Sequence, residues 1–573
     1  MTYQAPIRDI AFALEAAAGL GELEPLFEGL DAGIVQAVLE GAGELASGVL
    51  APLNRLGDRE GSRLENGRVV TPAGFVDAYR AFAEGGWNSL AADPGYGGQG
   101  LPKALELAVW EMINAANMSF ALCPTLTQAA IEALQRHGTE RHKTVLLPKL
   151  VSGEWTGTMH LTEPQAGTDL AAIRTLAEPD GNGGWKLSGQ KIFITWGDHD
   201  LTPNIVHLVL ARTPDAPPGV RGLSLFVATS RDVADDGSLG VANALGPASL
   251  EHKLGIHASP TCVMLYEGAR AELVGELNQG LAQMFVMMNA ARVAVGVQGV
   301  GIAEGAYQHA LAYARERRQG RSPWSDDPSA LIFDHPDVRR MLAAMKAKIA
   351  AARAICFCAG VAADLARLAP TGQQRHKADL RSQLLTPIAK AWSTDVGVEV
   401  ASLGVQVHGG MGFIEETGAA QYYRDARIAP IYEGTNGVQA IDLVGRKLAM
   451  ENGEAVADLI AEMRALVPQL DASVGGVLGA GIDAVERASQ GLAKAGGTVA
   501  LAGATMYLKL FGDVLGGALL CKGAQAAAAG DDEAWAKDRA ALARFYAEQI
   551  LTGAPALADA ALAGDEALKA ISF

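Results

Sequence analysis

Apolar residues recur at helical spacing from about residue 36 to residue 153. The run LELAVWEMINAANM at 105–118 is typical, and clusters of Gly and Pro such as ADPGYGGQGLP at 92–102 interrupt the pattern. We therefore predict an N-terminal helical domain over 36–155, preceded by a lead-in at 1–35. Short runs rich in β-branched and aromatic residues then follow, such as NIVHLVLART at 204–213, with turn residues between them. These runs predict a central β-domain over 156–278, built as a barrel or a sandwich.

Beyond residue 279 the long segments again carry helical periodicity, without a strand-like pattern. They predict a C-terminal four-helix bundle over 279–450, with polar linkers at 318–334 and 369–383. An Ala-rich stretch over 451–573 predicts an additional helical domain, with a hinge at the Gly-rich segment 475–483. The fold class is α+β, mostly α. Because the strands cluster in mid-chain, the alternating order of a doubly wound sheet is excluded.

Composition and charge narrow the function classes. The chain of 573 residues is 49% apolar and 19% charged, which is typical of several packed domains. A net charge of −17 repels phosphate backbones, so nucleic acid is excluded as a partner. Five scattered cysteines without metal-ligand spacing predict a reducing cytoplasm and no metal site. The apolar stretch 497–520 contains Lys509 and Asp513, which favours a buried or interface helix, with membrane-surface attachment as the alternative.

One motif matches a nucleotide-binding pattern but lacks the strand that such a site requires. Residues 95–100, GYGGQG, match the pattern of a dinucleotide-binding loop. That loop needs a parallel strand before it, whereas Asp93 and Pro94 precede it here and the segment upstream is helical. We therefore expect a tight turn between helices. Gly299 and Gly301 lie inside a helical pattern and indicate close helix packing.

Two segments of the β-domain carry candidate binding chemistry. Residues 159–169, MHLTEPQAGTD, gather hydroxyls, a glycine and backbone amides in one turn, which suits a flavin ring or a carbonyl. In KIFITWG at 191–197, strand alternation would place Phe193 and Thr195 on one face, where they could flank a planar ring. An ordinary capped turn and a half-buried strand are the alternatives, and local pattern does not exclude them.

Two further segments lie in the helical bundle. QVHGGMGF at 406–413 places three glycines within four residues after a helix, which exposes amides to an anion. In RDARIAPIYEGTN at 424–436, Glu433 lies between an apolar aromatic run and a turn that begins a helix. A carboxylate held against apolar surface has a raised pKa, as a general base requires. An exposed glutamate at a helix start is the common alternative.

These four segments, in this order, resemble the acyl-CoA dehydrogenase family over roughly 36–450. Five other stretches support the resemblance: 86–100, 137–139, 147–150, 253–257 and 313–317. The lead-in and the tail after 450 resemble the longer subfamily that includes 3-methylmercaptopropionyl-CoA dehydrogenases. The resemblance implies FAD bound between the β-domain and the helical domains, and a fourth helical domain.

The resemblance assigns roles to single residues. Glu433 matches the catalytic base. Flavin contacts fall on Met159, Leu161, Thr162, Gly167, Thr168, Phe193, Thr195, Arg317, Gln406, Gly409, Gly410 and Thr435. Thr168 and Arg292 match substrate-side positions. Arg317, Gln406, Gly409 and Gly410 match positions that act partly across a subunit interface, which implies a homodimer or homotetramer.

Three positions depart from the family pattern. Many relatives have Trp at the position of Phe193, and an arginine is common at that of His257. Some members carry the base just before the arginine equivalent to Arg292, but this chain has Ala291 there. Glu433 is therefore the candidate base.

The resemblance also implies a reaction of fatty-acid β-oxidation. Glu433 would remove the α-proton of an acyl-CoA while the β-hydride passes to flavin N5, giving a trans-2-enoyl-CoA, and an electron-transfer flavoprotein would take the electrons. Two alternatives stay open at this point: an acyl-CoA oxidase that passes electrons to oxygen, and a flavin-free scaffold of the same fold. Acyl chain length, branching and sulfur content do not follow from these motifs.

Overall fold

The computed structural model describes residues 3–573, apart from the side chain of residue 290. Its first part is mainly helical. The helices and the short hairpin of this part are α1 (Ile7–Phe12), α2 (Ala32–Leu45), α3 (Ala51–Glu60), β1 (Arg63–Glu65), β2 (Arg68–Val70), α4 (Phe75–Glu84), α5 (Lys103–His137) and α6 (Leu147–Val151). The sequence pattern did not predict the hairpin β1–β2. The GYGGQG segment forms a 3-10 turn (Pro94–Tyr96) and a loop before α5, as expected for a turn between helices.

The middle of the chain forms a closed barrel. Its strands, with a separate short pair, are β3 (Thr156–His160), β4 (Leu176–Pro179), β5 (Trp185–Thr195), β6 (Ile205–Arg212), β7 (Leu223–Thr229), β8 (Arg231–Val233), β9 (Leu239–Ala242), β10 (Leu245–Leu250) and β11 (Thr261–Val274). The order β11-β5-β4-β6 is completed by β7, which pairs with both β6 and β11. A ring of strands leaves few open edges, and Val209, Phe226 and Leu187 fill its interior.

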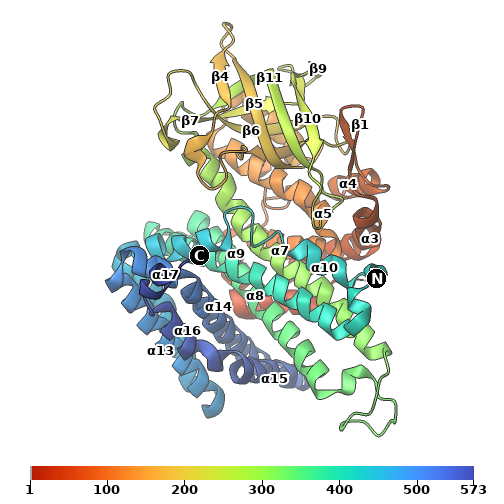
Figure 1. Ribbon diagram of the computed structural model, residues 1–573, viewed down its shortest axis with the longest axis vertical. Helices are drawn as coiled ribbons and strands as arrows, with labels where there is room; N and C mark the ends of the chain where they lie inside the picture. The colour runs from red at the N-terminus through yellow and green to blue at the C-terminus, as the bar shows by residue number, and fades with distance from the viewer. Residues whose placement is uncertain (1–2) are drawn as a thin grey trace.

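Long helices form the centre of the molecule below the barrel (Figure 1). They are α7 (Gly280–Glu316), α8 (Pro336–Leu368) and α9 (Gly372–His408), followed by the shorter α10 (Ala419–Ala426) and α11 (Asn436–Asp442). Helices α7, α8 and α9 pack against one another and against α5. A Cβ at Gly299 would lie 2.4 Å from the Ser393 carbonyl oxygen, and one at Gly301 would lie 2.7 Å from that of Glu111. These glycines therefore allow the close helix packing expected from the sequence.

The last helices pack beside this bundle (Figure 1), and they also contact the first helix of the chain and the turn after it. They are α12 (Glu454–Leu466), α13 (Ala472–Ala495), α14 (Gly497–Ala528), α15 (Glu533–Gln549), α16 (Ala554–Ala561) and α17 (Glu566–Ala570). The order of helical domain, barrel, helical bundle and further helical domain confirms the predicted fold class. Helix α14 contacts α8 and α9, and the Asp513 carboxylate accepts a 2.9 Å hydrogen bond from Trp392 of α9.

Two local expectations were wrong. The segment 369–383 is mostly helix, because Thr371 and Gln374 form a capping box that begins α9 at Gly372. The Gly-rich segment 475–483 is no hinge but part of α13, where Gly481 lets Val514 and Ala554 approach closely. At α9 a local capping box therefore begins the helix within a polar segment, whereas at α13 tertiary packing outweighed the tendency of glycine to break a helix.

Four helical stretches are long and apolar enough to cross a membrane by length and composition: Ala32–Glu60, Gly280–Glu316, Pro336–Leu368 and Gly497–Ala528. In the last three, 65%, 72% and 72% of the most apolar window is buried in the fold. Their apolar surface is therefore largely used in helix packing. In Ala32–Glu60 the buried share is 39%.

Candidate functional site

Glu433 lies in the turn between α10 and α11, in a strained backbone conformation. Its φ is +55°, and Gly434 follows with φ +85°. For a residue with a side chain, this left-handed conformation costs about 1 to 2 kcal/mol. Both ends of the turn are held: the Asn436 amide donates to the Pro430 carbonyl at 3.0 Å, and the Thr435 hydroxyl caps α11 by accepting from the Val438 amide. Strain of this kind persists where the surroundings enforce it and is common at functional sites.

The Glu433 carboxylate is part-buried between two cations. Burial raises its pKa from 4.5 to about 7, and the positive charges of Arg292 and Lys390 oppose that rise. A carboxyl group with a pKa near neutrality is suited to general base catalysis, because it is partly ionised at working pH and still accepts a proton readily. The alternative of a simply exposed helix-start glutamate therefore does not describe Glu433.

The two cations come from different helices. Arg292 is a buried residue of α7 whose guanidinium donates to the Asn289 side chain at 3.0 Å, while its Nε has no acceptor within the described residues. Lys390 is a fully buried residue of α9 whose Nζ donates to Asn436 Oδ1 at 2.9 Å. Burial lowers its pKa to about 8, against the opposing charge of Glu433. The sequence-based prediction included Arg292 but missed Lys390.

The expected flavin contacts of the barrel form one group, around the end of β3 and the end of β5. Met159 lies on β3, and Leu161 follows it in a buried position. The Ile192 amide of β5 donates to the Thr162 carbonyl at 2.9 Å, which joins the two chain segments. Gly167 and Thr168 are exposed in the turn that follows. These residues lie together around the ends of β3 and β5.

A β-bulge changes the expected geometry at Phe193. The pairing of β5 with β11 shifts register between Ile194–Cys262 and Lys191–Met264, and Phe193 has φ +58°. Regular alternation therefore does not hold through Phe193, contrary to the expectation that it would set the faces of Phe193 and Thr195. The Phe193 side chain is 59% exposed, whereas Thr195 is half-buried. A bulge re-aims a side chain, and bulges are frequent beside active sites.

A buried ion pair supports the turn after β3. The Lys191 ammonium donates to Glu163 at 2.8 Å and to the Leu161 carbonyl at 3.0 Å. Glu163 also accepts from the amides of Arg174 and Thr175, and its pKa is lowered to about 2 because these partners outweigh the effect of burial. Neither residue was among the predicted site residues. In the sequence, the signal that could have identified this pair was Lys191, a charged residue in the otherwise strand-like run at 191–197.

The remaining predicted contacts lie at the far ends of α7 and α9. Tyr313 of α7 stacks on His408 of α9, with ring centroids 4.4 Å apart. Arg317 lies shortly after Tyr313, and Gly409 and Gly410 directly follow His408. All three residues are exposed, as is Gln406. A Cβ at Gly409 or Gly410 would meet nothing within 4 Å, so a ligand can approach the backbone closely there, whereas the Gly409 amide itself donates to the Gln406 carbonyl. This group is joined to the bundle but not, within one chain, to the Glu433 turn.

His257, which stands where relatives often have arginine, keeps a role in joining domains. Its Nδ1 lies 2.8 Å from the Asp58 carboxylate, and its Nε2 lies 3.0 Å from the Lys253 carbonyl oxygen. Arg424 of α10 binds the same Asp58 at 2.6 Å. The barrel loop, α3 and α10 are therefore connected through one carboxylate.

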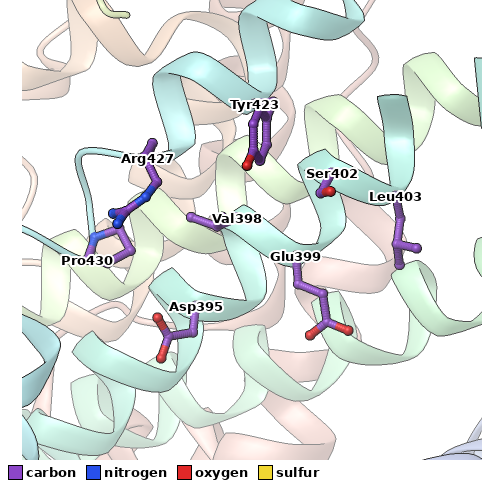
Figure 2. A pocket seen from close by; sticks show the side chains of 8 residues that line it. All are labelled: Asp395, Val398, Glu399, Ser402, Leu403, Tyr423, Arg427 and Pro430. Atoms are coloured by element: carbon purple, nitrogen blue, oxygen red, sulfur yellow. The ribbon is translucent and has the colours of Figure 1, made fainter. Parts of the chain in front are cut away.

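Figure 2 shows a surface cavity of about 460 Å³ beside α9, close to the Glu433 turn but not containing Glu433. Its lining residues are Asp395, Val398, Glu399, Ser402, Leu403, Tyr423, Arg427 and Pro430. Asp395 also accepts a 2.7 Å hydrogen bond from Asn436. The cavity therefore borders residues that hold the Glu433 turn in place, and not the Glu433 carboxylate.

Family models match four consecutive stretches of the chain. Residues 38–154, 158–268 and 278–449 match the N-terminal, middle and C-terminal domains of acyl-CoA dehydrogenase. Residues 455–572 match a domain described as acetyl-CoA dehydrogenase C-terminal like.

Curated relatives and solved structures agree with these matches. The chain is 48% identical to 3-methylmercaptopropionyl-CoA dehydrogenase of Ruegeria pomeroyi, over 96% of both chains. It is 37% identical to a butyryl-CoA dehydrogenase of Syntrophomonas wolfei, over 72% of this chain and 70% of the relative. The fold matches Caenorhabditis elegans ACDH-11 in complex with C11-CoA, with a TM-score of 0.79, 23% identity and coverage of 96% and 92%. It also matches a Bacillus anthracis acyl-CoA dehydrogenase complexed with FAD, with a TM-score of 0.73, 21% identity and coverage of 94% and 89%.

Proposed function

The chain belongs to the acyl-CoA dehydrogenase family, and from that premise we propose that it oxidises an acyl-CoA to the trans-2-enoyl-CoA with FAD as cofactor and Glu433 as base. The observation that carries the proposal is the Glu433 carboxylate itself. It is held in a strained turn, its pKa is raised to about 7, and two buried cations lie near it. No structural need for a helix cap explains this arrangement, because Thr435 already caps α11.

The reaction requires a base and a stabilised carbonyl oxygen. The α-hydrogen of a thioester becomes acidic only when donors stabilise the developing enolate charge. The backbone amide of Glu433 has no acceptor within residues 3–573, so it is free to donate to the thioester carbonyl while the carboxylate takes the proton. When bound, FAD accepts the β-hydride and passes the electrons on. Arg292 and Thr168 are assigned to the substrate side.

The barrel residues fit the flavin. The Phe193 ring is 59% exposed and is therefore available to pack on the face of a planar ring. The exposed Thr168 hydroxyl and the Gly167 backbone can bond to a ring edge, and a Cβ at Gly167 would meet nothing within 4 Å, which leaves room for close approach. We assign the remaining flavin contacts to Met159, Leu161, Thr162, Thr195 and Thr435.

The adenosine end of FAD requires a second subunit. Arg292 lies within the first half of α7 and Arg317 directly follows its end, so the two are roughly 37 Å apart at about 1.5 Å per residue. An extended FAD molecule is shorter than this, so a flavin at Glu433 does not reach Arg317 of its own chain. Arg317, Gln406, Gly409 and Gly410 therefore serve the flavin of a neighbouring chain in a homodimer, or in a tetramer built from such dimers.

Replacement of the base tests the proposal. Glu433→Gln keeps the size of the side chain, so FAD content should stay at the wild-type level while anaerobic bleaching of the flavin by acyl-CoA is abolished. The panel should begin with 3-methylmercaptopropionyl-CoA and butyryl-CoA, the acyl groups named for the two relatives. Glu415→Gln, on an exposed 3-10 turn, is the matched control and should bleach normally. Full bleaching of Glu433→Gln would show that another group removes the proton.

The electron acceptor is tested separately. We assign it to an electron-transfer flavoprotein, as in the family the chain resembles. With that acceptor present, turnover should proceed with little peroxide. Peroxide formation as fast as enoyl-CoA formation, without the acceptor, would identify an oxidase instead.

A further inference from the structure

Lys390 is a buried charge that the proposed chemistry does not yet use. Its side chain is fully buried in the bundle, and within the described residues its Nζ forms no ion pair and one hydrogen bond, to Asn436 Oδ1. An ammonium group has three donors, and burying it without a partner is costly. Lys348, the buried lysine of α8, shows the usual solution, because it forms an ion pair with Glu399. The cost at Lys390 therefore requires a reason.

Its hydrogen bond leads directly to the Glu433 turn. Asn436 follows Gly434 and Thr435, and its own amide closes the turn by donating to Pro430. The Asn436 side chain accepts from Lys390 at 2.9 Å and from Thr394 at 3.2 Å, and it donates to the Ala391 carbonyl at 3.0 Å. One side chain thus joins the turn to α9 in several directions. Lys390 is the charged member of that connection.

Charged and polar groups from several packed elements surround Glu433. Helix α7 contributes Arg292, α9 contributes Lys390, and Tyr432 is the neighbour on the turn. Behind Lys390, Asp395 is an exposed carboxylate at the edge of the surface cavity, where Arg427 and Lys509 of α14 act on it.

Behind Arg292 lie Asp442 and Arg446, whose charges oppose each other. The acidic neighbour of Lys390 other than Glu433 is Asp395, whose carboxylate accepts a 2.7 Å hydrogen bond from Asn436. Arg292 and Lys390 both favour the ionised form of Glu433, and Lys390 is the one that is also bonded to the turn, through Asn436.

We propose that Lys390 is a positioning residue for the base: through Asn436 it holds the strained turn, and its charge favours the ionised form of the Glu433 carboxylate. This inference rests on the proposed function, because it assigns a role relative to Glu433. It explains why a lysine is buried without a carboxylate in contact. A direct ion pair would stabilise Glu433 so strongly that it would be a poor base, whereas a cation slightly farther away favours ionisation and leaves the carboxylate free to take a proton.

The test separates charge from hydrogen bonding. Lys390→Met removes both, Lys390→Gln removes the charge and keeps a donor for Asn436, and Lys390→Arg keeps the charge. Lys348→Met is the matched control for loss of a buried lysine in the same bundle. For each FAD-loaded variant, the rate constant of anaerobic flavin reduction is measured from pH 5.5 to pH 9, together with FAD content and melting temperature.

In Lys390→Met and Lys390→Gln, the pH midpoint of reduction should rise by roughly one unit, because a nearby positive charge is lost. Below both midpoints, reduction should then be about tenfold slower than in the wild type. Lys390→Arg should restore the midpoint, and Lys348→Met should not move it. In the apoprotein, the melting temperature should fall with rising pH relative to that of the same variant carrying Glu433→Gln, and the pH at which this fall levels off should move upward in Lys390→Met and Lys390→Gln.

Equal slowing at every pH, with an unmoved midpoint, would mean that Lys390 only maintains the fold and would overturn the inference. If Lys390→Met does not fold, Lys390→Gln decides by the same criterion. The proposed function fails in a different way, by full bleaching of Glu433→Gln. Loss of bleaching in Glu433→Gln combined with an unmoved midpoint in Lys390→Gln would refute the role of Lys390 alone.

Discussion

At the scale of single residues, Glu433 combines two features that each reduce stability. Its backbone is left-handed, and its carboxyl group is held where burial raises its pKa. Structural residues seldom keep such costs, because a replacement without them would be more stable. The sequence could suggest the raised pKa from the apolar residues before Glu433. It could not show the conformation of the turn, which depends on Asn436 and on helix α9.

The raised pKa gives a prediction about stability. Between pH 4.5 and about 7 the folded protein holds a proton on Glu433 that the unfolded chain has released, so wild-type stability falls as pH rises through this window. Glu433→Gln lacks this loss. We expect the variant to gain stability relative to the wild type from pH 5 to pH 8, on the order of 1 to 2 kcal/mol once partial solvent screening is allowed for. Chemical unfolding of the two apoproteins at pH 5 and at pH 8 measures this gain in stability. A constant difference between the two proteins would contradict the raised pKa.

At the scale of elements, the periodicity of the apolar residues predicted the long helices and the strands in mid-chain, but not the hairpin β1–β2. Periodicity is a local signal, and it was strong in the long helices α7, α8 and α9. It failed where distant contacts decide. The β5 bulge at Phe193 depends on pairing with β11, and the Gly-rich part of α13 is helical because Val514 and Ala554 pack against it. Lys390 was missed for the same reason, since only packing shows that it is buried.

The turn after β3 gives a prediction at this scale. Lys191→Met leaves the Glu163 carboxylate buried without its cation, which should cost about 3 to 5 kcal/mol. The double variant Lys191→Met/Glu163→Gln removes that isolated charge and should regain most of the stability. It should still retain less FAD, because the bond from Lys191 to the Leu161 carbonyl that holds the turn is absent. Melting temperature and the ratio of flavin to protein absorbance separate the two effects.

Arg270→Gln is the control for this experiment, because it breaks an exposed ion pair with Asp232 in the same barrel. It should change neither the melting temperature nor the ratio of flavin to protein absorbance appreciably. A double variant with wild-type FAD content would show that the buried pair supports the barrel and not the flavin turn.

At the scale of the whole molecule, the separation of Arg317 from Arg292 along α7 predicts that each flavin site uses two chains. A closed dimer with a two-fold axis then contains two equivalent sites, each with Glu433 from one chain and Arg317 from the other. Pairing a Glu433→Gln chain with an Arg317→Ala chain places both defects in one site and leaves the second site intact. If Arg317 served its own chain, each site of the same pair would carry one defect.

Co-expression of the two variants with different affinity tags, followed by purification on both tags, isolates the mixed dimer. Each single-variant protein should be nearly inactive: Glu433→Gln for lack of a base, and Arg317→Ala for weak FAD retention. The mixed dimer should recover about half of the wild-type activity and FAD content, because one of its two sites is complete. A doubly tagged Glu433→Gln dimer controls for carry-over of wild-type protein. A mixed dimer no more active than its parents would place Arg317 in the flavin site of its own chain, against the distance along α7, or outside the flavin site altogether.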